Sequence, residues 1–308
     1  MSGAARAAVV TVAHNSSARL GEWVDALERS GARDRLELCV VDSGSGPEEL
    51  EATRTVLAGR VESFLCVPNL GFGRASNVGV AWTSAPVLIF LNPDARLETL
   101  PDDLLDPAQV ARTIVGPELL LADGAVDSAG FRHLPTARWE AVSLLLGRRA
   151  ATYERAWSDP AYISGGTLLM TRADFERLGG FSPELFLYFE DADLCRRHRR
   201  EGGGIRVDRR WSVHHDGADS SSNLWRPDAL DGLARWSARR LAAREEGRLA
   251  AGLLWVLLAL VYVPRRGVAE LRRGRRRSVT DTLLDLVLPS RILRRLNAVP
   301  PDPVTAAA

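Results

Sequence analysis

The sequence predicts an α/β fold in which helices flank a mostly parallel central sheet, followed by a helical C-terminal region. Over residues 1–100, short apolar runs alternate with segments that have the apolar spacing of helices. That alternation is typical of βαβ units, whose parallel strands are covered on both faces. The 308 residues are 46% hydrophobic and 26% charged, which are globular values. The length fits one large α/β domain with an appendage, or two modest domains.

The predicted strands of the first half are continuous apolar runs, as expected for strands buried on both faces. They cover residues 7–13, 36–41, 61–67 and 86–91. Apolar residues recur at helical spacing between the first two runs, at Leu20, Trp23, Val24 and Leu27. Pro47 opens a second helix after the second run, because proline is favoured at the first helical position.

Polar residues follow each of these predicted strands. Thr11 and Asn15 follow the first, Asp42 ends the second, Asn69 follows the third and Asp94 follows the fourth. In open α/β sheets the ligand binds beyond the carboxyl ends of the strands. A single aspartate after a strand is usually a turn residue, but four polar strand ends in succession predict a shared ligand site.

The segment after the third strand is rich in glycine. It reads Asn-Leu-Gly-Phe-Gly-Arg-Ala-Ser-Asn-Val-Gly over residues 69–79. The glycines permit close backbone approach to a ligand, and the following helix can place its N-terminus near a phosphate. Taken alone, the segment fits a tight strand-to-helix turn equally well. The sequence contains neither the G-x-G-x-x-G dinucleotide motif after the first strand nor a P-loop.

Residues 185–194 place three acids directly after an aromatic run that begins at Phe181. Acids in a first helical turn are favoured by the helix dipole, so the stretch by itself fits an ordinary helix start. The polar strand ends favour a second interpretation, in which a catalytic carboxylate is held at a helix N-terminus beside an aromatic wall.

The second half is less regular. Residues 111–121 and 125–131 are predicted to form short strands around an Asp-Gly turn, residues 163–170 and 205–213 to form further strands, and residues 172–178 to form a short helix. Residues 134–160 lack periodicity, which fits either an acceptor-side flap or a surface insertion.

Charge and cysteine content exclude some classes of protein. The net charge is +1, which gives no indication of nucleic-acid binding, and all 40 basic residues are arginine. Cys39, Cys66 and Cys195 are scattered and suggest no disulfide framework. The N-terminus enters an apolar strand without the pattern of a signal peptide, so we expect a cytoplasmic protein in a reducing compartment.

The C-terminal region, residues 223–308, follows a polar, serine-rich stretch and is rich in arginine. Residues 250–263 are almost all apolar but fall short of the roughly 20 residues that span a bilayer. Together with the arginine run at 272–277 and an amphipathic stretch at 283–296, they predict a helix that binds an anionic membrane surface. The alternatives are a helical bundle with a solvated basic face, or a helix buried at the subunit contact of a homo-oligomer.

Taken together, these segments resemble the inverting family 2 glycosyltransferases of the GT-A fold, and more narrowly their bacterial rhamnosyltransferase branch. The pieces that carry the resemblance lie within residues 7–222 and are Val-Thr-Val-Ala-His-Asn at 10–15, Val-Asp-Ser-Gly-Ser at 41–45, the 69–79 segment, Asn-Pro-Asp at 92–94, Asp-Ser-Ala-Gly at 127–130, Ser-Gly-Gly at 164–166, Gly-Gly-Phe at 179–181 and Phe-Glu-Asp-Ala-Asp-Leu at 189–194. The resemblance implies a catalytic domain over residues 1–222, with a donor-nucleotide half (1–100) and an acceptor half (101–222).

The resemblance also implies a role for each matching residue on the donor side. Asp94 would bind Mg²⁺ or Mn²⁺, and Asn92 would be a neutral contact to the metal's water shell or the diphosphate. Asp42 would recognise the base or ribose. The other donor-binding residues implied are Thr11, Ala13, Asn69, Gly71 and Asn77. Asn92 stands where many members have a first aspartate, and His14 where relatives often have tyrosine, so tight metal binding without nucleotide and the role of His14 are open.

On the acceptor side the resemblance makes Asp191 the catalytic base and Glu190 a contact that binds or orients the acceptor. Asp193 is interpreted as no more than a first-turn acid. His214 would complete the metal site, with His215 as the fallback.

The implied activity is metal-dependent, inverting transfer of a deoxyhexose, L-rhamnose from dTDP-rhamnose, to a polyprenyl-diphosphate-linked sugar in cell-wall or polysaccharide synthesis. The implied location is the inner face of the cell membrane. The alternatives are a transferase of the same fold with another donor or acceptor, a sugar nucleotidyltransferase, and a non-catalytic scaffold. A nucleotidyltransferase would need a glycine-rich loop and a basic residue directly after the first strand, where Ala-His-Asn-Ser stands. Loss of Asp94 or of the Glu-Asp pair at 190–191 would favour a scaffold, and all three acids are present.

Overall fold

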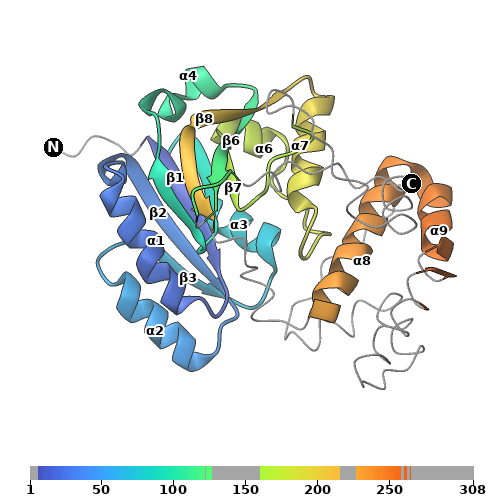
Figure 1. Ribbon diagram of the computed structural model, residues 1–308, viewed down its shortest axis with the longest axis horizontal. Helices are drawn as coiled ribbons and strands as arrows, with labels where there is room; N and C mark the ends of the chain where they lie inside the picture. Colours follow the sequence, from blue (N-terminus) through green and yellow to red (C-terminus); the bar gives the residue numbers. More distant parts are fainter. Residues whose placement is uncertain are drawn as a thin grey trace.

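A computed structural model describes residues 6–121, 123–126, 160–215, 227–257, 260, 261 and 264 (Figure 1). In these residues the centre of the fold is an eight-stranded sheet with the strand order β3-β2-β1-β4-β7-β6-β8-β5. The predicted α/β class is confirmed. The sheet is mixed, with parallel strands in the first half of the chain and antiparallel pairs where the second half joins it.

The first half forms the parallel part of the sheet. Strands β1 (Ala7–Ala13), β2 (Leu36–Ser43), β3 (Ser63–Val67) and β4 (Val87–Leu91) follow the predicted apolar runs. They are connected through α1 (Ser17–Arg29), the short helix η1 (Arg33–Arg35), α2 (Pro47–Leu57) and α3 (Phe72–Ala81). All carboxyl ends of these strands therefore meet at one edge of the sheet.

The second half completes the sheet with β5 (Ala95–Thr99), β6 (Thr113–Leu120), β7 (Thr167–Thr171) and β8 (Gly204–His215). The helices between and after these strands are η2 (Asp102–Leu105), α4 (Pro107–Val110), α6 (Arg172–Arg177), α7 (Glu190–Arg200), α8 (Pro227–Glu245) and α9 (Gly247–Leu257). Strand β7 runs antiparallel to both β4 and β6, and β5 antiparallel to β8.

Helices cover both faces of the sheet (Figure 1). On one face, Leu20, Trp23 and Leu27 of α1 pack with Leu57 of α2 against β1 and β2. On the other, residues of α3, α6 and α7 pack against β4 and β7, and Leu241 of α8 belongs to the same cluster. Helix α8 is thus packed into the core of the domain that precedes it. The domain boundary expected at residue 222 stays a prediction. A boundary there would separate α8 from helices that it contacts through Leu241.

Some predicted segments differ in detail or lie outside the described residues. The strand predicted from residue 163 begins at Thr167, because the chain first turns at 164–167, where the Thr167 amide donates to the Ser164 carbonyl. Of the strand predicted at 125–131, Val126 forms an isolated bridge with Leu120. Most of the predicted flap at 134–160, the arginine run at 272–277 and the stretch at 283–296 lie outside the described residues.

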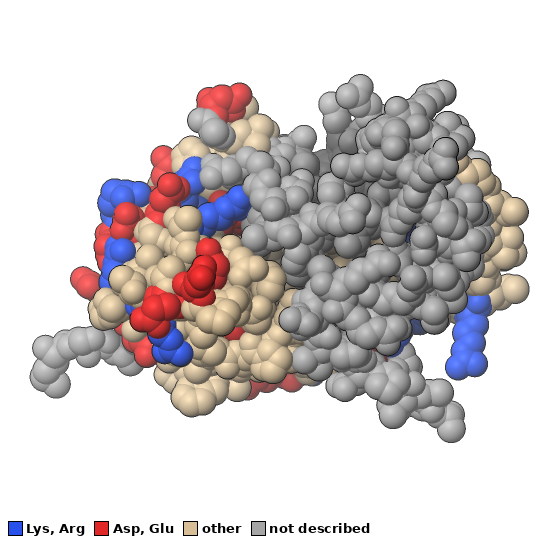
Figure 2. Space-filling model, turned by 90° about the horizontal axis from the view of Figure 1, so that it is seen from below, with Lys and Arg blue, Asp and Glu red and all other residues tan. Residues whose placement is uncertain are grey.

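Within the part of the chain that the structure describes, no helix is long and apolar enough to cross a membrane. On the described part of the face shown in Figure 2, arginine side chains are interspersed with acidic ones. This mixture agrees with the balanced net charge of +1.

Candidate functional site

The loops after β1 and β2 are tied together at the carboxyl edge of the sheet. His14 Nδ1 lies 2.8 Å from the Ser43 carbonyl oxygen, and the Asn15 amide donates to Ser45 Oγ at 2.7 Å. The Gly46 amide donates to Asn15 Oδ1 at 3.2 Å. Asn15 has a φ of 47°, a left-handed conformation that asparagine tolerates well. These contacts make one continuous polar floor from two loops that are about 30 residues apart in the chain.

Asp42 lies in this floor with one satisfied and one unsatisfied oxygen. Its side chain is buried, and Oδ1 accepts a hydrogen bond from the Ser45 amide at 2.9 Å. Within the described part of the chain, Oδ2 is buried without a hydrogen-bond partner. A buried acceptor without a partner is costly, so its presence points to a ligand group that supplies a donor.

Thr11 and Ala13 are buried in β1, beside this floor. Thr11 Oγ1 donates to the Leu91 carbonyl at 2.7 Å, so the hydroxyl joins β1 to β4. The side chain thereby connects the two strands near their carboxyl ends. Direct contact of either residue with a donor stays a prediction.

The glycine-rich segment docks against the turn that precedes α7. Gly71 has a φ of 77°, and a Cβ atom there would lie 1.9 Å from the Phe186 carbonyl oxygen. The Phe72 amide donates to that same carbonyl at 3.2 Å. Gly71 is therefore required both by its backbone conformation and by the close approach of the other half of the chain.

The two asparagines of this segment make bonds of different range. Asn69 is buried, and its Oδ1 accepts a local hydrogen bond from the Gly71 amide at 3.3 Å. The Asn77 side-chain Nδ2 donates to the Phe181 carbonyl at 2.8 Å, and its Oδ1 accepts from the Phe181 amide at 2.9 Å. The Asn77 bonds hold the donor half against the acceptor half. Donor binding by Asn69, Gly71 and Asn77 stays a prediction.

The Asn-Pro-Asp turn after β4 contacts a second glycine pair. The Asn92 amide donates to the Gly166 carbonyl at 2.8 Å. A Cβ atom on Gly166 would lie 2.5 Å from Asn92 Nδ2, so a larger residue there would have to displace the Asn92 side chain. Asp94 is 4% exposed, and its Oδ1 is buried without a hydrogen-bond partner.

A cation and a histidine approach the other oxygen of Asp94. Arg19 Nη1, from α1, lies 3.3 Å from Oδ2, and His215 Nε2, from the end of β8, lies 3.7 Å from it. Sequence reasoning did not identify Arg19. The sequence feature that could have identified it is its position in the first turn of α1, directly after the polar residues that follow β1.

The two candidate metal histidines have different neighbours. His214 Nε2 contacts Glu98 Oε2 at 2.7 Å, whereas His215 Nε2 lies 3.7 Å from Asp94 Oδ2. In β8, His214 pairs with Arg96 and His215 with Ala95, and successive residues of a strand point to opposite faces of the sheet. Of the two, the fallback residue His215 is the one beside Asp94, and the metal role of either histidine stays a prediction.

Asp94 and His215 could supply only some of the ligands that a divalent cation needs. Among the described residues, no group of three or more histidine, cysteine or acidic side chains gathers around one point. The pair does leave Asp94 Oδ1 and His215 Nδ1 buried and unpartnered. Two protein ligands fit a hard cation such as Mg²⁺ or Mn²⁺, which commonly completes its coordination with water and substrate phosphates.

The predicted base lies on the other side of the same glycine pair. Asp191 is half-buried at the start of α7, with Oδ2 accepting from the Gly165 amide at 2.9 Å and Oδ1 from the Ala192 amide at 2.7 Å. A Cβ atom on Gly165 would lie 3.2 Å from Asp191 Cβ. The consecutive glycines of one turn thus contact Asp191 on one side and Asn92 on the other.

Glu190 precedes the base and is almost fully buried, at 5% exposure. Its Oε2 has no hydrogen-bond partner. Burial raises the pKa of the Glu190 carboxyl well above its ordinary value, and the negative charge of Asp191 raises it further. The side chain lies against α3, since a Cβ atom on Gly73 would come within 3.4 Å of Glu190 Cβ.

The backbone that leads into α7 adopts an unusual conformation. Tyr188 and Phe189 have φ values of 68° and 69°, which non-glycine residues rarely adopt, and Phe189 caps the helix. Two successive left-handed residues of this kind persist only where the surroundings hold them. They direct the first turn of α7, with Glu190 and Asp191, toward the glycine turn.

Two interpretations of this region need correction. Phe181 and Phe186 are fully buried, and the Phe181 ring packs against Phe90 and Phe175 at centroid distances of 4.9 and 5.4 Å. They are core residues and do not form a wall of the sugar site. Asp193, expected to be no more than a first-turn acid, is 1% exposed and forms ion pairs with two arginines.

Comparisons with known proteins agree with this geometry. A family model described as Glycosyl transferase family 2 matches residues 8–178. The chain is 26% identical over 307 residues to an N-acetylglucosaminyl-diphospho-decaprenol L-rhamnosyltransferase of Mycobacterium tuberculosis, covering 88% of this chain and 96% of that protein. It is 30% identical over 143 residues to rhamnosyltransferase WbbL of Escherichia coli K12, covering 41% of this chain and 53% of WbbL.

Among solved structures, a similar fold is seen in the mannosyltransferase PcManGT from Pyrobaculum calidifontis, described in complex with GDP-Man and Mn²⁺. The TM-score is 0.52 at 15% sequence identity, with 93% of this chain and 87% of that chain covered. At this identity the likeness concerns the fold.

Proposed function

The chain belongs to glycosyl transferase family 2, and from this premise we propose that it transfers L-rhamnose from dTDP-rhamnose to a polyprenyl-diphosphate-linked sugar with inversion at the anomeric carbon. One observation carries the proposal furthest. Asp191 and the Asn-Pro-Asp turn contact neighbouring glycines, Gly165 and Gly166, so the carboxylate proposed as the base lies near the turn proposed to bind the diphosphate.

On the acceptor side, Asp191 would remove the proton of the attacking hydroxyl. That oxygen forms the new bond to the anomeric carbon while the bond to the diphosphate oxygen breaks on the opposite face, which inverts the configuration. The two amide donors on Asp191 fix the direction of its carboxylate. A positioned base of this kind contributes about 10²–10⁴-fold to the rate.

On the donor side, Asp42 would accept a hydrogen bond from the base or ribose through its unpartnered Oδ2. Asp94 and His215 would hold Mg²⁺ or Mn²⁺, which supplies the charge that stabilises the leaving diphosphate. Arg19 lies beside Asp94 and provides a fixed positive charge at the same place. The Mn²⁺ in the similar mannosyltransferase supports a divalent cation in this fold.

The identity of the sugar and acceptor rests on the relatives. The alignment with the mycobacterial protein spans 96% of that protein, and its name describes transfer of L-rhamnose to a lipid-linked N-acetylglucosamine. A lipid-linked acceptor requires the enzyme to work at a membrane. We place it at the inner face of the cell membrane, where nucleotide sugars are available.

Helix α9 offers a surface for that membrane. Leu249, Leu253 and Val256 of α9 are between 55% and 79% exposed, and Leu260, just beyond the helix, is 70% exposed. The spacing of the three α9 residues puts them on one helical face, because residues four and three positions apart lie above one another. The arginine-rich sequence that follows residue 264 favours an anionic lipid surface.

A donor screen tests the reaction. The full chain would be incubated with Mn²⁺, N-acetylglucosaminyl-diphospho-prenol and, in turn, dTDP-rhamnose, GDP-mannose, UDP-glucose and UDP-N-acetylglucosamine. We expect transfer from dTDP-rhamnose, with a product whose anomeric configuration is opposite to that of the donor. Transfer from another donor alone would contradict the sugar assignment, and a retained configuration would contradict the mechanism.

Vesicle flotation tests the membrane surface. We expect the full chain to float with vesicles that contain anionic lipid, and the double variant Leu249→Ser, Leu253→Ser to float less. Trp82→Ser, at an apolar residue 62% exposed at the end of α3, is the matched control and should float as the wild type does. Equal flotation of the double variant and the wild type would contradict a role of α9 in membrane binding.

A further inference from the structure

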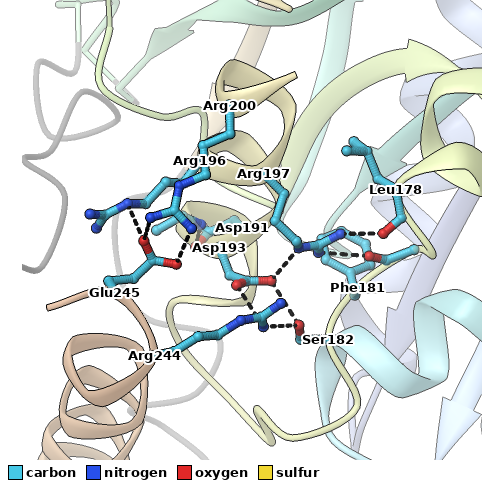
Figure 3. Close-up of polar contacts among 12 residues, drawn as sticks. Leu178, Phe181, Ser182, Asp191, Asp193, Arg196, Arg197, Arg200, Arg244 and Glu245 are labelled. Atoms are coloured by element: carbon cyan, nitrogen blue, oxygen red, sulfur yellow. Dashed lines mark hydrogen bonds and ion pairs between the residues drawn. The ribbon is translucent and has the colours of Figure 1, made fainter. Parts of the chain in front are cut away.

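A buried network of charges joins α7 to α8 (Figure 3). Asp193, on the first turn of α7, is 1% exposed. Its Oδ2 accepts from Ser182 Oγ and from Arg197 Nε, both at 2.8 Å, and its Oδ1 accepts from Arg244 Nη1 at 3.1 Å. Arg244 also donates to Ser182 Oγ at 2.9 Å. An arginine near the end of α8 therefore closes a ring of bonds around the carboxylate.

A second cluster lies beside the first (Figure 3). The Glu245 side chain is 2% exposed and lies 2.7 Å from Arg196 Nε and 2.5 Å from Arg200 Nη2. The residues of α7 that take part in the two clusters are 193, 196, 197 and 200, which share one face of the helix. Two neighbouring residues at the end of α8 thus pair with opposite charges of α7. Arg244 pairs with Asp193, and Glu245 pairs with two arginines.

Further contacts of α8 reach the strained turn before α7. Ser237 Oγ donates to the Leu187 carbonyl at 2.8 Å, directly before the left-handed Tyr188 and Phe189. Arg240 lies 3.8 Å from Glu184 across the same turn. The polar residues 237, 240 and 244 of α8 recur at the spacing of one helical face, so α8 presents a single surface to the whole segment.

These contacts bracket Asp191. The carbonyl of Leu187 is held four residues before the base, and the carboxylate of Asp193 is held two residues after it. Buried ion pairs add little net stability compared with apolar packing, but removal of one partner leaves a buried charge without compensation. Such a network fixes geometry better than it adds stability.

We propose that α8 is a positioning element of the active site, and that Asp193 and Arg244 are positioning residues that set the orientation of the first turn of α7. This inference rests on the proposed function, in which Asp191 is the base. Neither residue touches the reacting groups. The proposal assigns a catalytic purpose to residues 227–245, which lie beyond the match to the family model at residues 8–178.

Full-length variants test the proposal through two measurements. The variants are Asp193→Asn, Arg244→Gln, Arg244→Lys and the double variant Asp193→Asn, Arg244→Gln. The control is Asp208→Asn on β8. Asp208 is also buried and binds two arginines, Arg206 and Arg210, and within the described part of the chain its hydrogen bonds and ion pairs involve neither α7 nor α8. The measurements are kcat and donor KM with dTDP-rhamnose, and amide hydrogen exchange over residues 184–195.

We expect Asp193→Asn and Arg244→Gln to lower kcat about 10–100-fold with little change in donor KM, because a displaced base costs rate without weakening donor binding. Exchange over 184–195 should accelerate while exchange in β1 and β2 stays unchanged. Arg244→Lys should recover part of kcat, and the double variant should lose little more than either single one. Asp208→Asn should leave kcat and this exchange unchanged.

Unchanged kcat in folded Asp193→Asn would overturn the proposal, as would equal loss in Asp208→Asn. If Asp193→Asn does not fold, Arg244→Gln carries the same test, because the Arg244 side chain is 40% exposed and its loss is better tolerated. If the wild type transfers no sugar, the proposed function fails, and the hydrogen-exchange result still decides whether Asp193 and Arg244 hold the first turn of α7.

Discussion

Glu190 and Asp193 lie three positions apart on the first turn of α7, and both are buried acids with opposite surroundings. Glu190 has an oxygen without a partner and a raised pKa. Asp193 is bonded to Ser182, Arg197 and Arg244. Because an unpaired buried acceptor costs about 1–3 kcal/mol, the first arrangement is retained where a ligand is to be bound, and the second where two elements are to be joined.

The same contrast extends to the sheet. Asp42 and Asp94, at the carboxyl ends of β2 and β4, each keep one buried oxygen without a partner. Asp208, away from that edge, binds Arg206 and Arg210, and the hydrogen bond from Arg210 holds its pKa well below the ordinary range. We expect substitutions at the unsatisfied acids to affect activity, and those at the satisfied acids to affect stability or geometry.

The largest expected effect is that of Asp191→Asn on the rate. Loss of the base should lower kcat about 10²–10⁴-fold, because asparagine cannot take the hydroxyl proton. Donor binding with Mn²⁺, measured by calorimetry, should stay close to the wild-type value, as should thermal unfolding. Near wild-type turnover in this variant would show that another group is the base.

Asp193→Asn should have the next largest effect, on stability. Removal of the buried charge leaves Arg197 and Arg244 without their partner, which we expect to lower the free energy of unfolding by about 3 kcal/mol. Urea unfolding at pH 7.5 measures the change, with Asp191→Asn as the neighbouring comparison. Equal free energies of unfolding for the two variants would contradict the proposal that Asp193 joins two elements of the structure.

His215→Ala should weaken Mn²⁺-dependent donor binding about tenfold, which corresponds to about 1.4 kcal/mol. His215 faces Asp94, whereas His214 is bonded to Glu98 on the other face of β8. His214→Ala is therefore the matched control and should bind donor as the wild type does. Calorimetry with and without Mn²⁺ distinguishes the two, and the reverse result would restore His214 as the metal ligand.

Glu190→Gln should have the smallest effect, a gain in stability at neutral pH. Since the pKa of Glu190 in the folded protein is raised above the ordinary value of 4.5, the carboxyl contributes its full stability below that value and loses it as pH rises through the raised one. The variant should have a larger free energy of unfolding than the wild type at pH 8. The gap should narrow toward pH 5, and a gap that widens on acidification would contradict a raised pKa.

Much of the donor half could be predicted from the sequence because its signals are local. The apolar runs identify β1 to β4, and the residues at their ends fall at one edge because parallel strands share a direction. The resemblance that these pieces carry agrees with membership of glycosyl transferase family 2. The glycines of the 69–79 segment predict close backbone approach, although the sequence does not identify Phe186 as the partner of Gly71.

Other features depended on contacts between distant segments. The sequence names two adjacent histidines, but the register of β8 against β5 decides which one faces Asp94, since a shift of one residue exchanges the two faces. Phe181 is apolar wherever it lies, and its place in a cluster with Phe90 and Phe175 makes it a core residue.

By itself, then, the sequence determined the order of the functional groups along the chain. It showed which carboxylates follow which apolar runs, and which acids begin α7. Only the tertiary structure decided which of those acids are left without partners and which are neutralised. The reason is physical. Whether a buried carboxylate is free for a ligand depends on the cations that packing brings to it. For Asp193 one cation, Arg197, is local, and the other, Arg244, is 51 residues away on another helix.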